Sequence, residues 1–129
     1  MKKIKKKIQG NIKNITEKST NPINEYCIIN KNKITYNKDN ITHTIYIKDD
    51  TLLLTRENEI FKHGMLFNKG KTKLSSYYLK ENNLCLDIPI ETIDMSIIYN
   101  NEIPEKIYIK YKVSDNDNIY EYKVTIGGI

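Results

Sequence analysis

The chain has 129 residues and a net charge of +5, with 39% apolar and 29% charged residues. This length suits one domain with one core and needs no disulfide or structural metal to fold. It contains no apolar run long enough to span a membrane, and no apolar segment of a signal peptide follows the lysine-rich start. We therefore expect a single cytosolic domain over residues 1–129.

Positive charge is concentrated at the start of the chain. Residues 1–13 hold six lysines and no acid, which leaves a net charge of −1 for residues 14–129. We predict that this segment is a Lys-rich first strand or arm whose charges are solvated. The alternative is a polyanion-binding segment. Its contacts would be Lys2, Lys3, Lys5, Lys6 and Lys7.

Composition and short apolar runs favour β structure through the first half. The chain has 23 Ile and 10 Tyr residues but no Ala and no Trp, and β-branched and aromatic residues favour strands. Strands are predicted at about residues 2–9, 11–17, 25–30, 33–37, 42–48 and 51–56. Asp49-Asp50 forms a two-residue turn between the last two. His43 shares a face with three isoleucines and is interpreted as a half-buried structural histidine, and we expect Cys27 and Cys85 to be reduced, buried thiols.

The second half shows clear alternation of apolar and polar residues. Residues 73–79 read as a strand, and a period of two continues through four later segments, which excludes helix there. The four apolar rows are Leu84, Leu86, Ile88 and Ile90; Ile93, Met95, Ile97 and Tyr99; Ile107, Ile109, Tyr111 and Val113; and Tyr120, Tyr122, Val124 and Ile126. Pro89 predicts a strand end, a bulge or an edge, and residues 115–118 predict a hairpin loop.

These elements define the fold class. So many short strands on so few residues favour a meander that closes on itself and removes its edges. We predict an all-β, closed or nearly closed antiparallel up-and-down barrel of about 8–10 strands, with little or no helix.

No local motif carries catalytic or metal chemistry. His43 and His63 are isolated, and the two cysteines lie 58 positions apart, so neither pair has the spacing of zinc ligands. No nucleophile has a base and an orienting group nearby in sequence. We therefore predict no catalytic residue, no metal and no cofactor, although carboxylates paired only in three dimensions stay open.

Arg56 is the one arginine beside 20 lysines. Its planar guanidinium offers five donors in a fixed fork, which an ammonium group does not copy. Inside a barrel it would cap buried carbonyls or pair with a carboxylate, which is the structural interpretation, or hold the anionic head of a ligand. Tyrosine combines an apolar ring with a polar tip and suits barrel mouths and pockets as well as ordinary packing.

From Arg56 onward the chain resembles the YwiB-like family, uncharacterised small proteins of Gram-positive bacteria with a lipocalin-like (calycin-type) barrel. The resemblance covers about residues 50–127 and includes a closing segment at 107–126. The matching positions are Arg56, Asn58, Phe67, Gly70, Tyr77, Asn82, Leu84 and Leu86. Asn58 and Asn82 replace glycines of the family, which a left-handed turn tolerates, and Ile90 replaces a threonine. The resemblance implies a barrel and no activity.

Three functions are compatible with these features. The leading hypothesis is a non-enzymatic domain that binds a small, partly apolar ligand inside the barrel, with Arg56 and Tyr77 as ligand contacts, because barrels of about eight strands either fill their interior or hold one ligand. The alternative is an interaction module that contacts RNA or another polyanion through the N-terminal lysines. A hydrolase or isomerase is the third.

Overall fold

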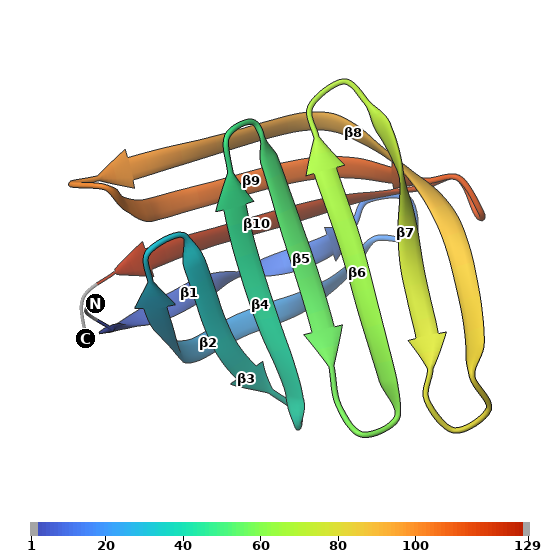
Figure 1. Cartoon of the computed structure of the whole chain (residues 1–129). Coiled ribbons are helices and arrows are strands. Elements are labelled where there is room, and N and C mark those ends of the chain that lie inside the picture. Colours follow the sequence, from blue (N-terminus) through green and yellow to red (C-terminus); the bar gives the residue numbers. More distant parts are fainter. Residues whose placement is uncertain (1–2, 128–129) are drawn as a thin grey trace.

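Ten antiparallel strands, and no helix, make up the part of the chain that the computed structural model describes, residues 3–127 (Figure 1). In chain order the strands are β1 (Ile4–Asn14), β2 (Ser19–Asn30), β3 (Lys33–Lys38), β4 (Ile41–Lys48), β5 (Thr51–Glu57), β6 (Phe61–Asn68), β7 (Thr72–Leu79), β8 (Leu84–Asn100), β9 (Ile103–Val113) and β10 (Asn118–Gly127). Residues 3–127 hold no helix of the length and apolarity that crossing a membrane requires.

The strands form a closed barrel. Each strand pairs with the next one in the chain, and β1 also pairs with β10. The closing register places Ile8 opposite Ile126 and Ile12 opposite Tyr122. Closure satisfies the backbone groups that an open sheet leaves along its two edges. The predicted all-β, up-and-down barrel is thus confirmed, with ten strands.

β8 is the corner of the barrel. Its 17 residues pair with β7 as far as Glu91 and with β9 from Ile90 onward. In Figure 1 it curves from the group of strands β3–β7 to the group β1, β2, β9 and β10, which run at a steep angle to the first. A break in register between Thr92 and Asp94 accompanies this bend, as bulges do at barrel corners. Pro89, predicted to mark a strand end, a bulge or an edge, lies inside β8 opposite Leu74 and not at the break itself.

The interior is packed tightly at one end of the barrel. Side chains alternate between the inside and the solvent along each strand, and the inward rows supply the core. The buried apolar residues include Ile8, Ile29, Ile34, Ile45, Leu52, Phe67, Ile107, Ile109 and Val124. Burying each of these side chains stabilises the fold by about 1.5–3 kcal/mol.

The first strand is continuous, where two strands were predicted. Residues 2–9 and 11–17 were assigned to separate strands, but β1 runs without a break from Ile4 to Asn14. Gly10 does not end a strand. It lies where β10 comes so close that a Cβ atom would fall 1.9 Å from the carbonyl oxygen of Lys123, a close approach that requires glycine within a strand.

The apolar rows of β8 were predicted only in part. One strand replaces the two predicted at 84–90 and 93–99. Leu84 and Leu86 alternate with their neighbours as expected but are 44% and 47% exposed, because they lie toward the open end of the barrel. Ile93 is exposed, since the bulge beside it interrupts the alternation, and Tyr99 is exposed near the end of the strand.

Two further local expectations were wrong. Cys27 is buried as predicted, but Cys85 is exposed on β8. Neither Asn58 nor Asn82 takes the positive φ angle expected for a replaced glycine, and the left-handed residue of the β7–β8 turn is Asn83, at φ 53°. In addition, β6 was not among the predicted strands.

Candidate functional site

Five interior side chains line up across five neighbouring strands. The registers pair Tyr36 of β3 with His43 of β4, His43 with Arg56 of β5, Arg56 with His63 of β6, and His63 with Tyr77 of β7. Directly paired residues share one face of a sheet, so all five belong to the inward side. We call these five residues the cross-sheet row.

Aromatic contacts hold the two ends of the cross-sheet row. The rings of Tyr36 and His43 are stacked with centroids 4.7 Å apart. At the other end the Tyr77 ring stacks on Phe61 at 5.4 Å and lies tilted against His63 at 5.3 Å. Because aromatic pairs in these geometries add to stability beyond the area that they bury, they fix the positions of both histidine rings around Arg56.

A chain of hydrogen bonds runs from Arg56 through His63 to Ser75. Arg56 Nη2 lies 2.9 Å from His63 Nδ1, and His63 Nε2 lies 2.9 Å from the Ser75 hydroxyl. A guanidinium only donates, so Nδ1 must accept and the ring proton must lie on Nε2. His63 therefore donates to Ser75, and the proton of the Ser75 hydroxyl stays free for another acceptor.

The positive charge of Arg56 has no acidic partner in the described residues. None of the ion pairs among residues 3–127 includes Arg56, and its Nε atom is buried without a hydrogen-bond partner. Phe61 lies beside the guanidinium, 5.9 Å from its central carbon to the ring centroid. Neither the carboxylate pair nor the carbonyl cap of the structural interpretation is formed in this part of the chain.

Both histidines of the row are neutral at pH 7. Burial, followed by the charge of Arg56, lowers the pKa of His63 from 6.5 to about 4. The pKa of His43 is also lowered to about 4, by burial first and then by Arg56 and Lys38. The two histidines beside Arg56 thus add no charge of their own.

The cross-sheet row borders a cavity at the end of the barrel opposite the packed core. Its volume is about 300 Å³. Both groups of strands line it, and the lining residues are Ile12, Asn21, His43, Leu54, Arg56, His63, Met65, Ser75, Tyr77, Ile88, Ile90, Tyr111, Val113, Tyr120 and Tyr122. An adjoining hollow of about 220 Å³ shares Ile12, Asn21, His43 and Arg56 with it and also touches Tyr36, Lys38 and Asp39. Lys38 and Asp39 form an ion pair at 3.6 Å.

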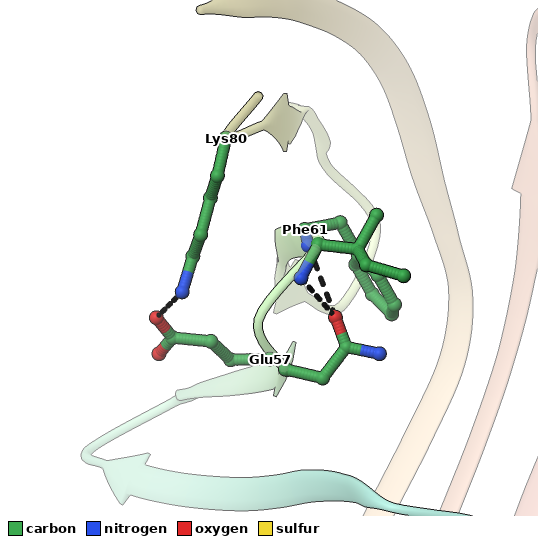
Figure 2. Close-up of polar contacts among 5 residues, drawn as sticks. Glu57, Phe61 and Lys80 are labelled. Atoms are coloured by element: carbon green, nitrogen blue, oxygen red, sulfur yellow. Dashed lines mark hydrogen bonds and ion pairs between the residues drawn. The ribbon is translucent and has the colours of Figure 1, made fainter. Parts of the chain in front are cut away.

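Hydrogen bonds within a turn and an ion pair stabilise the end of the barrel next to Arg56. The Oδ1 atom of Asn58 accepts hydrogen bonds from the backbone N–H groups of Ile60 and Phe61 at 2.8 and 3.0 Å. Figure 2 shows these bonds and the ion pair of 2.8 Å between Lys80 and Glu57. Glu57 thus follows Arg56 in sequence but pairs with a different cation.

The structure places the two predicted ligand contacts together. Arg56 and Tyr77 both line the cavity and both contact His63. Their role as ligand contacts stays a prediction. His63 and Ser75 were missed, although the alternation of Phe61, His63, Met65 and Phe67 indicates an inward row on β6.

The N-terminal lysines that the structure describes lie on both faces of β1. Lys2 lies outside the described residues. Lys5 and Lys7 lie over the exposed ring of Tyr26, at 4.7 and 5.7 Å from its centroid. Lys6 is half-buried and pairs with the buried Cys27, on the opposite face of β1, and Lys3 is exposed just before the strand. Their role in polyanion binding stays a prediction.

Within residues 3–127 no three His, Cys, Asp or Glu side chains lie close enough together to hold a metal ion. The polar groups at the cavity are instead a guanidinium, two imidazoles, the side-chain amide of Asn21, a serine hydroxyl and tyrosine hydroxyls. This set suits hydrogen bonding to an organic ligand.

Comparisons with known proteins give a family and a similar fold. No curated protein matches it. The crystal structure of ywiB protein from Bacillus subtilis is similar in fold, with a TM-score of 0.68 at 14% sequence identity over 98% of this chain and 92% of that one. A family model, described as a domain of unknown function (DUF1934), matches residues 3–126. Because the match spans nearly the whole chain, the protein belongs to the DUF1934 family.

Proposed function

We propose that this protein is a non-enzymatic binding domain that holds one small, partly apolar molecule inside its barrel. The observation that carries the proposal is the interior cavity of about 300 Å³. A barrel that served only as a rigid scaffold would fill its interior with side chains. Small-ligand sites combine a mostly apolar wall with a few convergent polar groups, which is the composition of this lining.

The direction of the hydrogen bond between His63 and Ser75 argues against a hydrolase. In a catalytic serine–histidine pair, an acid accepts the Nδ1 proton and leaves Nε2 free to take the serine proton. Here Arg56 donates to Nδ1, so Nε2 carries a proton and donates to Ser75. The neighbouring cation also weakens His63 as a base. We expect no labelling of Ser75 by a fluorophosphonate reagent. Rapid labelling would support the hydrolase hypothesis instead.

The binding proposal is tested by blocking the cavity. Native mass spectrometry of freshly purified protein shows whether a small molecule is retained. Isothermal titration calorimetry then measures the binding of two pairs of probes. The pairs are octanoate with octanamide, and benzoate with benzamide. Ile88 pairs with Ser75 in the β7–β8 register and lines the cavity. It is replaced by tryptophan to fill the space. The control is Ile98→Trp on the same strand, where the side chain is 53% exposed.

We expect at least one probe to bind the wild-type protein and the Ile98→Trp variant alike, and Ile88→Trp to weaken that binding at least tenfold. Thermal unfolding of both variants shows that they are folded. If no probe binds and no molecule is retained, or if Ile88→Trp binds as well as wild type, the barrel interior is not a binding site.

The alternative, RNA binding through Lys2, Lys3, Lys5, Lys6 and Lys7, stays a separate prediction. Phosphate contacts made by lysines weaken steeply with salt. The test is binding of a single-stranded RNA at about 50 mM salt, compared with a variant in which these lysines are replaced by glutamine. Absence of binding, or binding that the replacement does not change, would exclude this function.

A further inference from the structure

The charge and the free donors at the cavity define the head group of its ligand. Arg56 brings a full positive charge to the cavity, and no carboxylate of the described residues neutralises it. Arg56 is half-buried and its Nε atom is buried, and a charge that is partly removed from water without a partner is costly. Binding of an anion would remove this cost, whereas binding of a neutral molecule would leave it in place.

Hydrogen bonding leads to the same conclusion by a separate route. The Nε proton of Arg56 is buried without an acceptor. The Ser75 hydroxyl is 2% exposed and accepts from His63, so its own proton needs an acceptor as well. The two groups are linked through one imidazole. At Arg56 and Ser75 the site thus offers two donors without acceptors, which match a group that accepts hydrogen bonds.

The net charge of the cavity distinguishes a monoanion from a dianion. The charged residues that line the cavity and its adjoining hollow are Arg56, Lys38 and Asp39. Lys38 and Asp39 form an ion pair, which leaves the charge of Arg56 alone. Both histidines are held neutral by burial beside Arg56. One uncompensated positive charge suits a carboxylate, and a phosphate or sulfate dianion would bring an unmatched second charge.

The size of the cavity limits the rest of the ligand. A water molecule occupies about 30 Å³ in the liquid, so 300 Å³ holds a molecule of about ten non-hydrogen atoms. Beyond the cross-sheet row, the wall consists of side chains such as Leu54, Met65 and Ile90, all buried. These side chains favour an apolar body.

We propose that the ligand of this barrel is a small organic monocarboxylate whose carboxylate binds Arg56 and the Ser75 hydroxyl while its apolar part lies against the buried wall. This inference rests on the proposed binding function and specifies the ligand class of the same site. Arg56 is therefore the residue that sets specificity. A planar guanidinium matches a carboxylate in both charge and geometry.

The test compares each carboxylate with its amide, which has nearly the same shape and no charge. In wild-type protein we expect octanoate or benzoate to bind tenfold to a hundredfold more tightly than octanamide or benzamide, the range for a hydrogen bond to a charged group. Arg56→Gln should abolish this preference, and Arg56→Lys should retain part of it. Lys80→Gln removes the same charge outside the cavity and should leave the preference unchanged. Thermal unfolding shows that each variant is folded.

The outcomes separate this inference from the proposed function. If amides bind as tightly as carboxylates in wild type and Ile88→Trp blocks both, the barrel binds apolar molecules but the carboxylate specificity is wrong. If the preference survives Arg56→Gln, or if inorganic phosphate displaces octanoate at equal concentration, the assignment to a monocarboxylate at Arg56 is also overturned. If no probe binds, the proposed function itself fails.

Discussion

Replacing Gly10 by alanine tests the pairing of β1 with β10, which closes the barrel. Gly10 pairs with Val124 of β10 on one side and with Ile23 of β2 on the other. A methyl group at this position would lie 1.9 Å from the carbonyl oxygen of Lys123 and 2.8 Å from the Cα atom of Val124. Both contacts are with backbone, so no side-chain rotation relieves them, and β1 and β10 must move apart by about 1 Å or more.

The size of the effect follows from the hydrogen bonds that this movement breaks. Backbone N–H···O bonds hold only over about 2.7–3.2 Å, so a shift of about 1 Å disrupts the ladder around Gly10. Losing about three bonds at about 1 kcal/mol each lowers the free energy of unfolding by about 3 kcal/mol. For a chain of this size we expect Tm to fall by roughly 10 °C, out of a total stability of about 5–15 kcal/mol.

The assay is urea and thermal unfolding followed by circular dichroism, with Gly64→Ala as the matched control. Gly64 also lies within a strand, but a Cβ atom there meets only the side chains of Leu53 and Thr55, at 4.0 Å. Alanine at Gly64 should therefore change the free energy of unfolding by less than about 1 kcal/mol, since it mainly reduces the entropy of the unfolded chain. A Gly10→Ala protein that unfolds within 2 °C of wild type would refute the reasoning.

Two further predictions concern buried groups near the cavity. Because the pKa values of His43 and His63 are about 4 in the folded protein and near 6.5 when unfolded, the unfolded chain binds more protons between these values, so Tm should fall as the pH drops from 7.5 to 5.5. His63→Gln should reduce this dependence, and a Tm that stays constant or rises would contradict it. The hydroxyls of Tyr36 and Tyr122 bond each other at 3.3 Å, both in buried residues. Tyr122→Phe should lower the free energy of unfolding in urea by about 1–3 kcal/mol and the double Phe variant by less, because a single replacement leaves one buried hydroxyl unpaired. A loss in the double variant equal to the sum of the two single losses would show that the hydroxyls do not interact.

The sequence predicts the fold well where alternation is local and unbroken. Ile107, Ile109 and Tyr111 on β9, and Tyr122 and Val124 on β10, are buried as the period of two indicates. Turn residues such as those at 49–50 are also local signals and were assigned correctly. These features depend on neighbours within a few residues, which is the range that a single sequence reports.

Features set by distant parts of the chain were not predicted. The continuity of β1 through Gly10 depends on how closely β10 approaches, more than 100 residues later. The exposure of Ile93 depends on the bulge that turns β8 from β7 to β9. Neither the close approach of β10 to Gly10 nor the bulge in β8 has a signature in the local alternation.

The site was predicted in outline and not in its contacts. Arg56 was identified because it is chemically unlike the 20 lysines, but its partner His63 comes from the hairpin register, which places residue 56 opposite residue 63. A strand assigned to β6 would have revealed this pair. The isoleucines that line the cavity give no sequence signal, since the same residue type fills the packed end.

The nuclear magnetic resonance signal of the Arg56 side chain tests the central claim most directly. Arg56 is the single arginine of the chain, so the Nε–H region of a ¹⁵N correlation spectrum contains one arginine signal that needs no assignment. We expect this signal to shift saturably as octanoate or benzoate is added, with the affinity measured by calorimetry, and to stay in place with the matching amide. A signal that does not move at saturating carboxylate would show that Arg56 does not hold the ligand.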